Sequence, residues 1–209
     1  MPRPTQSNCT TAEQRATQGQ HCRPRIQNSG SRNIEPQTPP LSFNMLWANY
    51  PKDSPYVGKD GKPPAGYENQ CAIKVSLSMQ ASGVNMGSFK GATVNVAGKK
   101  LAIRAEELAR WIKVNKPAGL LTPVNLTGAD WKAKGSGKKG IIYFANYWRR
   151  DGEKTPSGDH IDLWNESRLT SSGLWGGTLS VLRFGLGVES IDGVYSDLGK
   201  ATEILLWEV

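Results

Sequence analysis

The chain has 209 residues, of which 37% are hydrophobic, and this is enough to build a packed core, so wholesale disorder is excluded. No apolar run approaches the roughly 18 residues that a helix needs to span a bilayer, which excludes a membrane-spanning protein. The net charge of +8 favours acidic partners such as nucleic acid, anionic lipid or another anionic polymer, without selecting among them. The first residues contain no apolar stretch of the kind found in secretory signals, so export would need another route.

Residues 1–42 differ in composition from the rest of the chain. They contain no Phe, Tyr, Trp or Val, and Pro, Gln, Ser, Thr and Arg dominate. They carry five Arg and two acidic residues, so the remainder is only mildly basic. Such a segment buries too little apolar surface to offset an ordering cost of about 1–2 kcal/mol per residue. We therefore predict a flexible N-terminal tail over residues 1–42 and one folded domain over residues 43–209.

The first half of the predicted domain is helical. Ser42 is placed to cap a short helix over residues 43–50. A loop rich in Pro, Gly and Asp follows over residues 52–66. The large apolar side chains of residues 71–81 are spaced so that a helix would bury one side. The pattern thus predicts a buried helix that opens at Cys71.

Strands dominate the second half. Residues 93–96 and 99–102 flank Ala97-Gly98, which favours a hairpin turn. Residues 103–116 place apolar side chains on one helical face and charged ones on the other. Further strands are predicted over residues 140–148, 160–165, 178–184 and 202–209. Helices first and strands afterwards indicate an α+β domain with a mostly antiparallel sheet.

Cysteine is scarce, with Cys9 and Cys22 in the predicted tail and Cys71 in the predicted domain. The two tail cysteines could bridge each other, pair between molecules or remain free. One Cys and one His in the domain cannot supply a paired metal-binding motif, so we expect no metal site. At a helix N-terminus, unsatisfied N–H groups favour a thiolate and can also stabilise an oxyanion. The alternative is that Cys71 is simply a small buried hydrophobic residue.

His160 is the only histidine of the predicted domain. Strand alternation places His160, Asp162 and Trp164 on one face, which we expect to meet the helix of Cys71. A Cys and His pair would act as nucleophile and base. The alternative is an edge-strand histidine beside a solvated aspartate.

A glycine-rich segment over residues 135–140 has the spacing of a dinucleotide-binding loop but precedes a predicted strand instead of following one, so it fails the required context. The nearby lysines are more typical of a solvated loop than of a nucleic-acid site; they are Lys132, Lys134, Lys138 and Lys139.

Two motifs carry a family resemblance. Residues 67–73 (YENQCAI), followed by a helix, and residues 158–165 (GDHIDLWN) resemble the fourth family of type VI secretion amidase effectors. The match extends from about residue 43 to the C-terminus. The resemblance implies a papain-like fold of the NlpC type, in which N-terminal helices pack on a mostly antiparallel sheet.

The resemblance also implies a function. Members of this family are cysteine amidases of peptidoglycan, and we expect cleavage of the γ-D-glutamyl to meso-diaminopimelate bond of stem peptides through an acyl-enzyme, without a cofactor. The protein would be an antibacterial toxin, synthesised in the cytoplasm, exported by the type VI apparatus without a signal peptide, and active in the periplasm of a target bacterium. Its expected partners are the stem peptide, a component of the secretion apparatus and a cognate immunity protein, with no nucleic acid and no transmembrane segment.

The site residues follow from the same resemblance. By position, Cys71 becomes the nucleophile and His160 the base. The family places an aspartate about eleven residues beyond the histidine, where this chain has Ser171. We therefore predict Asp162 as the third catalytic residue and keep Ser171 as the alternative. Two rival interpretations are a papain-like acyltransferase that uses the same pair, and a non-catalytic module that binds cell wall or nucleic acid.

Overall fold

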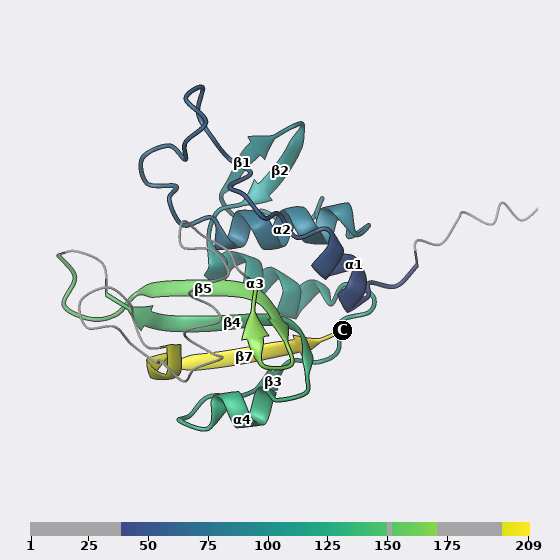
Figure 1. Ribbon diagram of the computed structural model, residues 1–209, viewed down its shortest axis with the longest axis vertical. Coiled ribbons are helices and arrows are strands. Elements are labelled where there is room, and N and C mark those ends of the chain that lie inside the picture. The colour runs from purple at the N-terminus through teal and green to yellow at the C-terminus, as the bar shows by residue number, and fades with distance from the viewer. Residues whose placement is uncertain (1–38, 150–151, 171–197) are drawn as a thin grey trace, which may run out of the picture. The chain divides into compact units, whose positions relative to one another are not determined.

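The computed structural model describes residues 39–149, 152–170 and 198–209. Its main feature is a five-stranded sheet in the order β3-β7-β4-β5-β6, in which every pair of neighbours is antiparallel (Figure 1). The strands are β3 (Val124–Asn125), β4 (Lys139–Trp148), β5 (Gly158–Asn165), β6 (Arg168–Leu169) and β7 (Glu203–Glu208). The predicted α+β class with a mostly antiparallel sheet is therefore confirmed.

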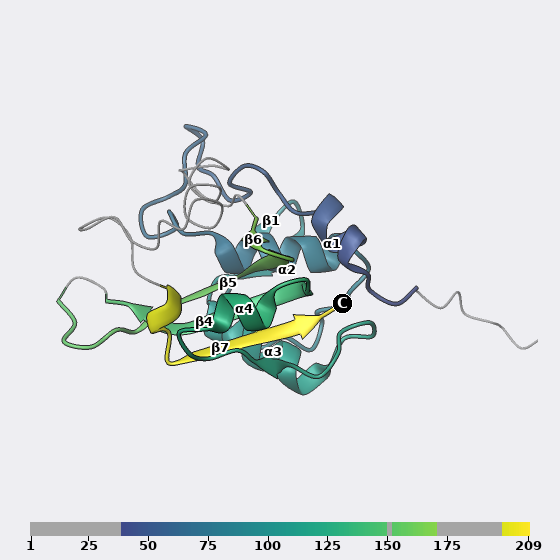
Figure 2. The ribbon, with the colours of Figure 1, turned by 60° about the horizontal axis from the view of Figure 1, so that its bottom comes forward.

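Helices cover both faces of this sheet (Figure 2). On one face, helices α1 (Phe43–Ala48), α2 (Cys71–Ala81) and α3 (Ala105–Asn115) bury a core cluster with alternate residues of β4, β5 and β7. On the other face, helix α4 (Trp131–Gly135) and the 3-10 turn η3 (Leu198–Lys200) pack against the remaining residues of these strands. Both views place α2 beside β5, at the edge of the long strands.

A separate hairpin packs on α2. Its strands are β1 (Thr93–Val96) and β2 (Lys99–Ala102), joined by Ala97 and Gly98. Both turn residues have positive φ, 48° and 79°, as a tight turn between twisted strands requires. Val94 and Leu101 of the hairpin pack against Ile73 of α2 in a small cluster of their own. The predicted hairpin is confirmed.

The predicted helices are also present. Ser42 caps α1 as expected, because its side chain accepts a hydrogen bond from the Met45 N–H at 3.4 Å. Helix α2 is buried on more than the one side expected from its apolar spacing. Helix α4 and the two-residue strand β3 were not predicted, because segments this short show no clear periodicity. The predicted strand over residues 178–184 lies outside the described residues.

The predicted tail over residues 1–42 lies almost wholly outside the described residues, and its boundary stays a prediction. Of the few residues described before Phe43, Leu41 is buried in the main core, and its N–H donates to the Ala118 carbonyl at 2.9 Å. The packed domain therefore includes at least this residue. Among the described residues, no helix combines the length and apolar character needed to cross a membrane.

Candidate active site

Cys71 is the first residue of α2, where the sequence placed it, and its side chain is partly exposed. The N–H groups in the first turn of a helix have no acceptor within the helix. The preceding residue, Gln70, does not cap them, because its amide bonds the loop instead: Nε2 donates to the Tyr56 and Tyr67 carbonyls at 2.6 and 3.1 Å, and Oε1 accepts from the Tyr56 N–H at 2.9 Å. The start of α2 is thus tied to the loop before it.

His160 of β5 lies against Cys71. The imidazole and the backbone N–H of Ile161 both lie close enough to the Cys71 thiol to lower its pKa through hydrogen bonding. The side chain of His160 is 19% exposed, so the pair is partly open to water. The structure therefore brings together the two residues that the sequence singled out.

The way in which they meet differs from the expectation. His160 and Asp162 pair across the sheet with Phe144 and Ile142, which pack in the cluster under α4. The core residues of α2 pack instead with Ile161 and Leu163, on the opposite face of β5. The prediction that the face of His160 meets α2 was therefore wrong. The start of α2 packs against β5, where the backbone N–H of Ile161 acts on the sulfur of Cys71.

Asp162 lies two residues further along β5, with only 2% of its side chain exposed. Its Oδ2 is 3.5 Å from His160 Nε2. Its Oδ1 accepts hydrogen bonds from the Leu163 N–H, at 2.8 Å, and from the Thr170 hydroxyl. Sequence reasoning missed Thr170, although it stands next to the alternative third residue. Ser171 itself lies outside the described residues.

These contacts shift the pKa values of Cys71 and His160 in the directions that favour a thiolate–imidazolium ion pair. Burial alone would raise the pKa of Cys71, but the hydrogen bond and charge of His160, with the Ile161 N–H, outweigh it and lower that pKa below its ordinary value. Burial alone would lower the pKa of His160, but its bonds and charge interactions with Asp162 and Cys71 raise it to about 10. The arrangement favours thiolate and imidazolium at neutral pH.

Aromatic side chains line the histidine. The rings of Phe144 and Tyr147 lie 6.3 and 6.2 Å from the imidazole, centroid to centroid. The indole of Trp148 covers the Cα of Gly158, where a Cβ atom would come within 1.9 Å of the indole Nε1. Only glycine fits under this indole, so the glycine of the second motif has a packing role.

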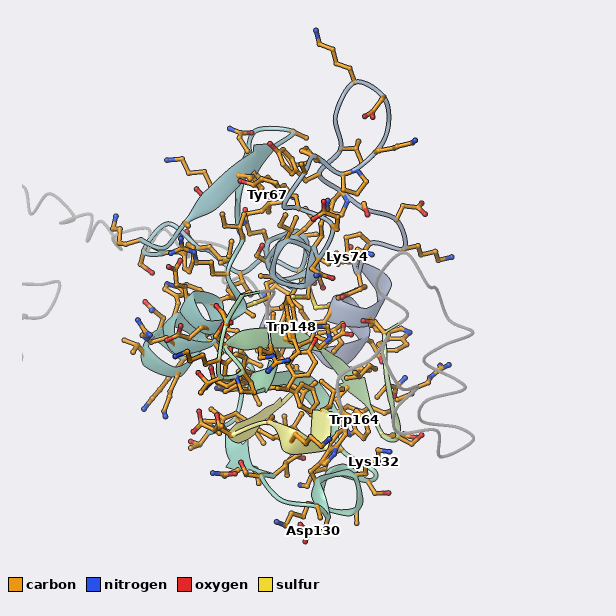
Figure 3. The ribbon with its side chains drawn as sticks, turned by 90° about the vertical axis from the view of Figure 1, so that its left-hand side faces the viewer. Tyr67, Lys74, Asp130, Lys132, Trp148 and Trp164 are labelled. Carbon is orange, nitrogen blue, oxygen red and sulfur yellow. The ribbon has the colours of Figure 1, made fainter. Side chains whose placement is uncertain are left out.

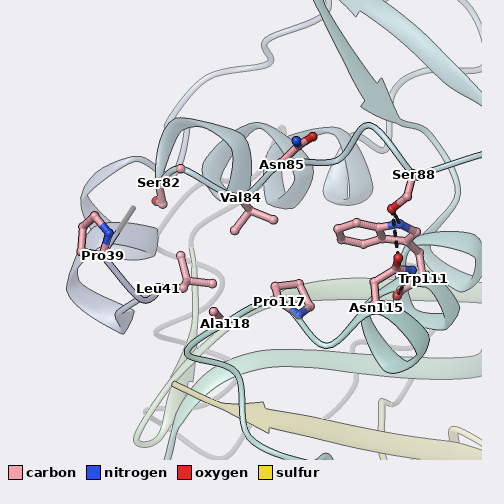
Figure 4. Close-up of a pocket in the computed structure, with 11 residues that line it drawn as sticks. Pro39, Leu41, Ser82, Val84, Asn85, Ser88, Trp111, Asn115, Pro117 and Ala118 are labelled. Carbon is pink, nitrogen blue, oxygen red and sulfur yellow. Dashed lines mark hydrogen bonds between the residues drawn. The ribbon is translucent and has the colours of Figure 1, made fainter. Parts of the chain in front are cut away.

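Elsewhere, a hollow of about 290 Å³ lies between the ends of α2 and α3 (Figure 4). It contains Trp111, whose indole N–H donates to Ser88 Oγ at 3.0 Å. None of the described residues that line it has an ionisable side chain, so it offers no acid, base or nucleophile. Across the described residues, no group of His, Cys, Asp or Glu side chains is placed to hold a metal ion.

Residues 67–207, which include both motifs, match the sequence model of a protein family described as Tae4: type VI secretion system (T6SS), amidase effector protein 4. The chain belongs to the Tae4 family. The family resemblance carried by residues 67–73 and 158–165 is thereby confirmed. No match is found among curated proteins.

Solved structures of Tae4 effectors share this fold. The Salmonella typhimurium effector Tae4, in complex with the immunity protein Tai4 from Enterobacter cloacae, is 22% identical, with a TM-score of 0.51 over 81% of this chain and 99% of that one. Tae4 from Enterobacter cloacae is 20% identical, with a TM-score of 0.50 over 81% and 96% of the two chains. At this identity the likeness concerns the fold.

Proposed function

We propose that this Tae4-family protein is a cysteine amidase that cleaves the γ-D-glutamyl to meso-diaminopimelate bond of peptidoglycan stem peptides, on a papain-like fold of the NlpC type. The observation that carries the proposal is the contact of the Cys71 thiol, at the N-terminus of α2, with the imidazole of His160. A low-pKa thiolate beside a protonated imidazole is the arrangement that covalent acyl transfer needs.

The first half of the reaction forms an acyl-enzyme. The Cys71 thiolate attacks the carbonyl carbon of the scissile amide, and the oxyanion that forms is stabilised by N–H groups of the first turn of α2. Gln70 is not a donor for this oxyanion, because its amide is engaged with the loop. The imidazolium of His160 gives its proton to the departing amine as the C–N bond breaks, which leaves a thioester on Cys71.

The second half releases the product. Neutral His160 takes a proton from water, and the hydroxide attacks the thioester carbonyl carbon. The C–S bond breaks, the thiolate returns, and the product leaves with a new carboxylate. Asp162 holds His160 through Nε2 and stabilises its charged form, and we propose it as the third catalytic residue.

The proposed setting follows from the family. We propose export by the type VI apparatus, action in the periplasm of a target bacterium, and neutralisation by a cognate immunity protein. The Tae4 relatives solved with Tai4 support this last partner. The mildly basic charge of the domain suits an anionic wall polymer.

The decisive experiment is digestion of defined muropeptides with purified protein, followed by mass spectrometry of the products. We expect one new pair of fragments with the mass of one added water and a cut at the γ-D-glutamyl bond. Cys71→Ala and His160→Ala should abolish turnover while keeping the thermal unfolding midpoint within a few degrees of the parent protein.

Each other outcome has a clear reading. Products joined to an added amine, without water, would indicate an acyltransferase. Binding to sacculi without any cleavage would indicate a non-catalytic module. Full turnover by the Cys71→Ala variant would contradict the proposed mechanism.

A further inference from the structure

A buried lysine lies one turn beyond the candidate nucleophile. Lys74 is on α2, three residues after Cys71, and is only 2% exposed (Figure 3). Lysine is almost never fully buried unless its charge is paired, because removing an ammonium group from water costs several kcal/mol. Nothing in the apolar spacing of residues 71–81 distinguishes this lysine from a solvent-facing one. Its burial therefore needs an explanation.

The surroundings of Lys74 supply one. Its Nζ donates to the backbone carbonyl of Lys52 at 3.3 Å, which ties the loop before α2 to the helix. Three groups act on the ammonium with negative charge: Asp162 from β5, Asp53 from the loop and Cys71 from its own helix. Burial lowers the pKa of Lys74, and these three negative charges oppose that effect.

The spacing brings these groups together in a regular way. Residues three apart on a helix share a face, so α2 presents Cys71 and Lys74 side by side. Residues two apart on a strand share a face, so β5 presents His160 and Asp162. Docking the start of α2 on β5 collects four ionisable side chains from only two short segments.

The charges of this cluster explain what the lysine does. Asp162 favours the imidazolium of His160 but, by the same negative charge, opposes a thiolate on Cys71. Thiolate, imidazolium and carboxylate together carry a net charge of −1 in a mostly buried place. The Lys74 ammonium, which interacts electrostatically with Asp162 and Cys71, brings the sum of these four groups to zero, and the exposed Asp53 is the further negative charge that acts on it.

We propose that Lys74 is a positioning residue of the candidate active site: its ammonium is the buried cation that balances Asp162, and it keeps the carboxylate and the Cys71 thiolate in their charged forms. This inference rests on the proposed roles of Cys71 and His160. It adds a fourth member to the site, from the helix that carries the nucleophile.

The test measures the thiolate directly and needs no amidase assay. In the full chain with Cys9→Ser and Cys22→Ser, the rate of alkylation of Cys71 by iodoacetamide is recorded against pH. Lys74→Gln keeps a hydrogen-bond donor for the Lys52 carbonyl but removes the charge, and we expect its midpoint to rise by about one pH unit. Lys74→Arg keeps the charge and should keep the midpoint near that of the parent.

Two further variants serve as controls for a general loss of positive charge and for a buried charge left unpaired. Lys113→Met removes a lysine from the exposed side of α3 and should leave the midpoint unchanged. Lys74→Met combined with Asp162→Asn removes both charges as a pair, so its midpoint should lie closer to the parent than that of Lys74→Gln. Because this double variant leaves no unpaired charge buried, it is informative even if Lys74→Gln fails to fold.

The inference would be overturned if the alkylation midpoint of Lys74→Gln equalled that of the parent. It would also be overturned if the midpoint of the double variant were at least as high as that of Lys74→Gln. If Lys74→Gln does not fold, a double-variant midpoint about one unit above the parent would overturn it, and a parent-like one would support it. The outcome is separate from that of the proposed function, since amidase turnover by Cys71→Ala would refute the mechanism whatever the alkylation shows.

Discussion

Helices α2 and α3 have the same length, 11 residues, but they are built on different principles. Helix α3 is amphipathic: Leu108 and Ile112 are buried, while acidic residues occupy its first turn and Lys113 its last. This distribution matches the helix dipole and a single covered face. Helix α2 has no such charges at its ends, and among its buried residues are Lys74, Ser76 and Ser78.

The polar residues of α2 bind its neighbours. Ser78 Oγ donates to the Leu46 carbonyl at 2.7 Å, which joins α2 to α1. Ser76 Oγ accepts from the Ala102 N–H at 3.1 Å, which joins α2 to the hairpin. Buried polar groups require partners in fixed positions, whereas apolar contacts tolerate sliding. Helix α3 therefore stabilises the fold, and α2 is held in the one position that places Cys71 against His160.

The largest effect is expected where β5 meets α2. Asp162→Asn should lower kcat/KM by about 10²- to 10⁴-fold, because the imidazolium loses its counter-charge and its orientation. Ser171→Ala, the matched test of the alternative third residue, should change kcat/KM less than tenfold. Steady-state hydrolysis of a defined muropeptide measures both. The reverse ranking would assign the third role to Ser171.

The pH profile of the parent protein sharpens the same point. Activity should rise at a pH below the ordinary cysteine range, because the pKa of Cys71 is lowered, and should fall as His160 loses its proton near pH 10. Asp162→Asn removes a charge that raises the pKa of His160, so its basic limb should move to lower pH. An unmoved basic limb would contradict the contact between these two residues.

The next effect tests α3 as a purely stabilising helix. Leu108→Ala removes a fully buried side chain and should lower the free energy of unfolding by about 2–5 kcal/mol. Because Leu108 belongs to the core and not to the site, kcat/KM per folded molecule should stay within about twofold of the parent. Urea unfolding and active-site titration measure the two quantities. Loss of activity at unchanged stability would contradict the conclusion that α3 only stabilises the fold.

A smaller loss of stability is expected from a polar residue of α2. Ser78→Ala leaves the buried Leu46 carbonyl without this donor and should cost about 1–3 kcal/mol. Since the bond also fixes α2, kcat/KM per folded molecule should fall as well, in contrast to Leu108→Ala. Ser136→Ala, at an exposed serine after α4, is the control and should stay within about 0.5 kcal/mol.

The smallest effect belongs to the exposed side of α3. Glu106 and Arg110 form an ion pair one turn apart, with 57% and 67% of their side chains exposed. Glu106→Gln should change the free energy of unfolding by less than about 0.5 kcal/mol, because water and salt screen such pairs. The same urea unfolding series measures it. A loss above 1 kcal/mol would mean that this surface is covered in solution.

Local patterns were enough to predict much of this protein. The apolar spacing of residues 71–81 predicted α2 and put Cys71 at its start, and alternation in residues 160–165 put His160 and Asp162 on one face of a strand. Such patterns reflect only which side chains of a segment face the core and which face water, so they can be interpreted without information on distant residues. The family followed from the same two segments.

Tertiary structure alone decided how those segments meet. No local pattern indicates that α2 docks on β5, that Thr170 donates to Asp162, or that Lys74 is buried in place of facing water. These contacts join separate elements of the fold, and the periodicity of a single segment does not determine them. The apolar periodicity of a helix shows which of its faces is buried, but the element that buries this face depends on the packing of the whole domain.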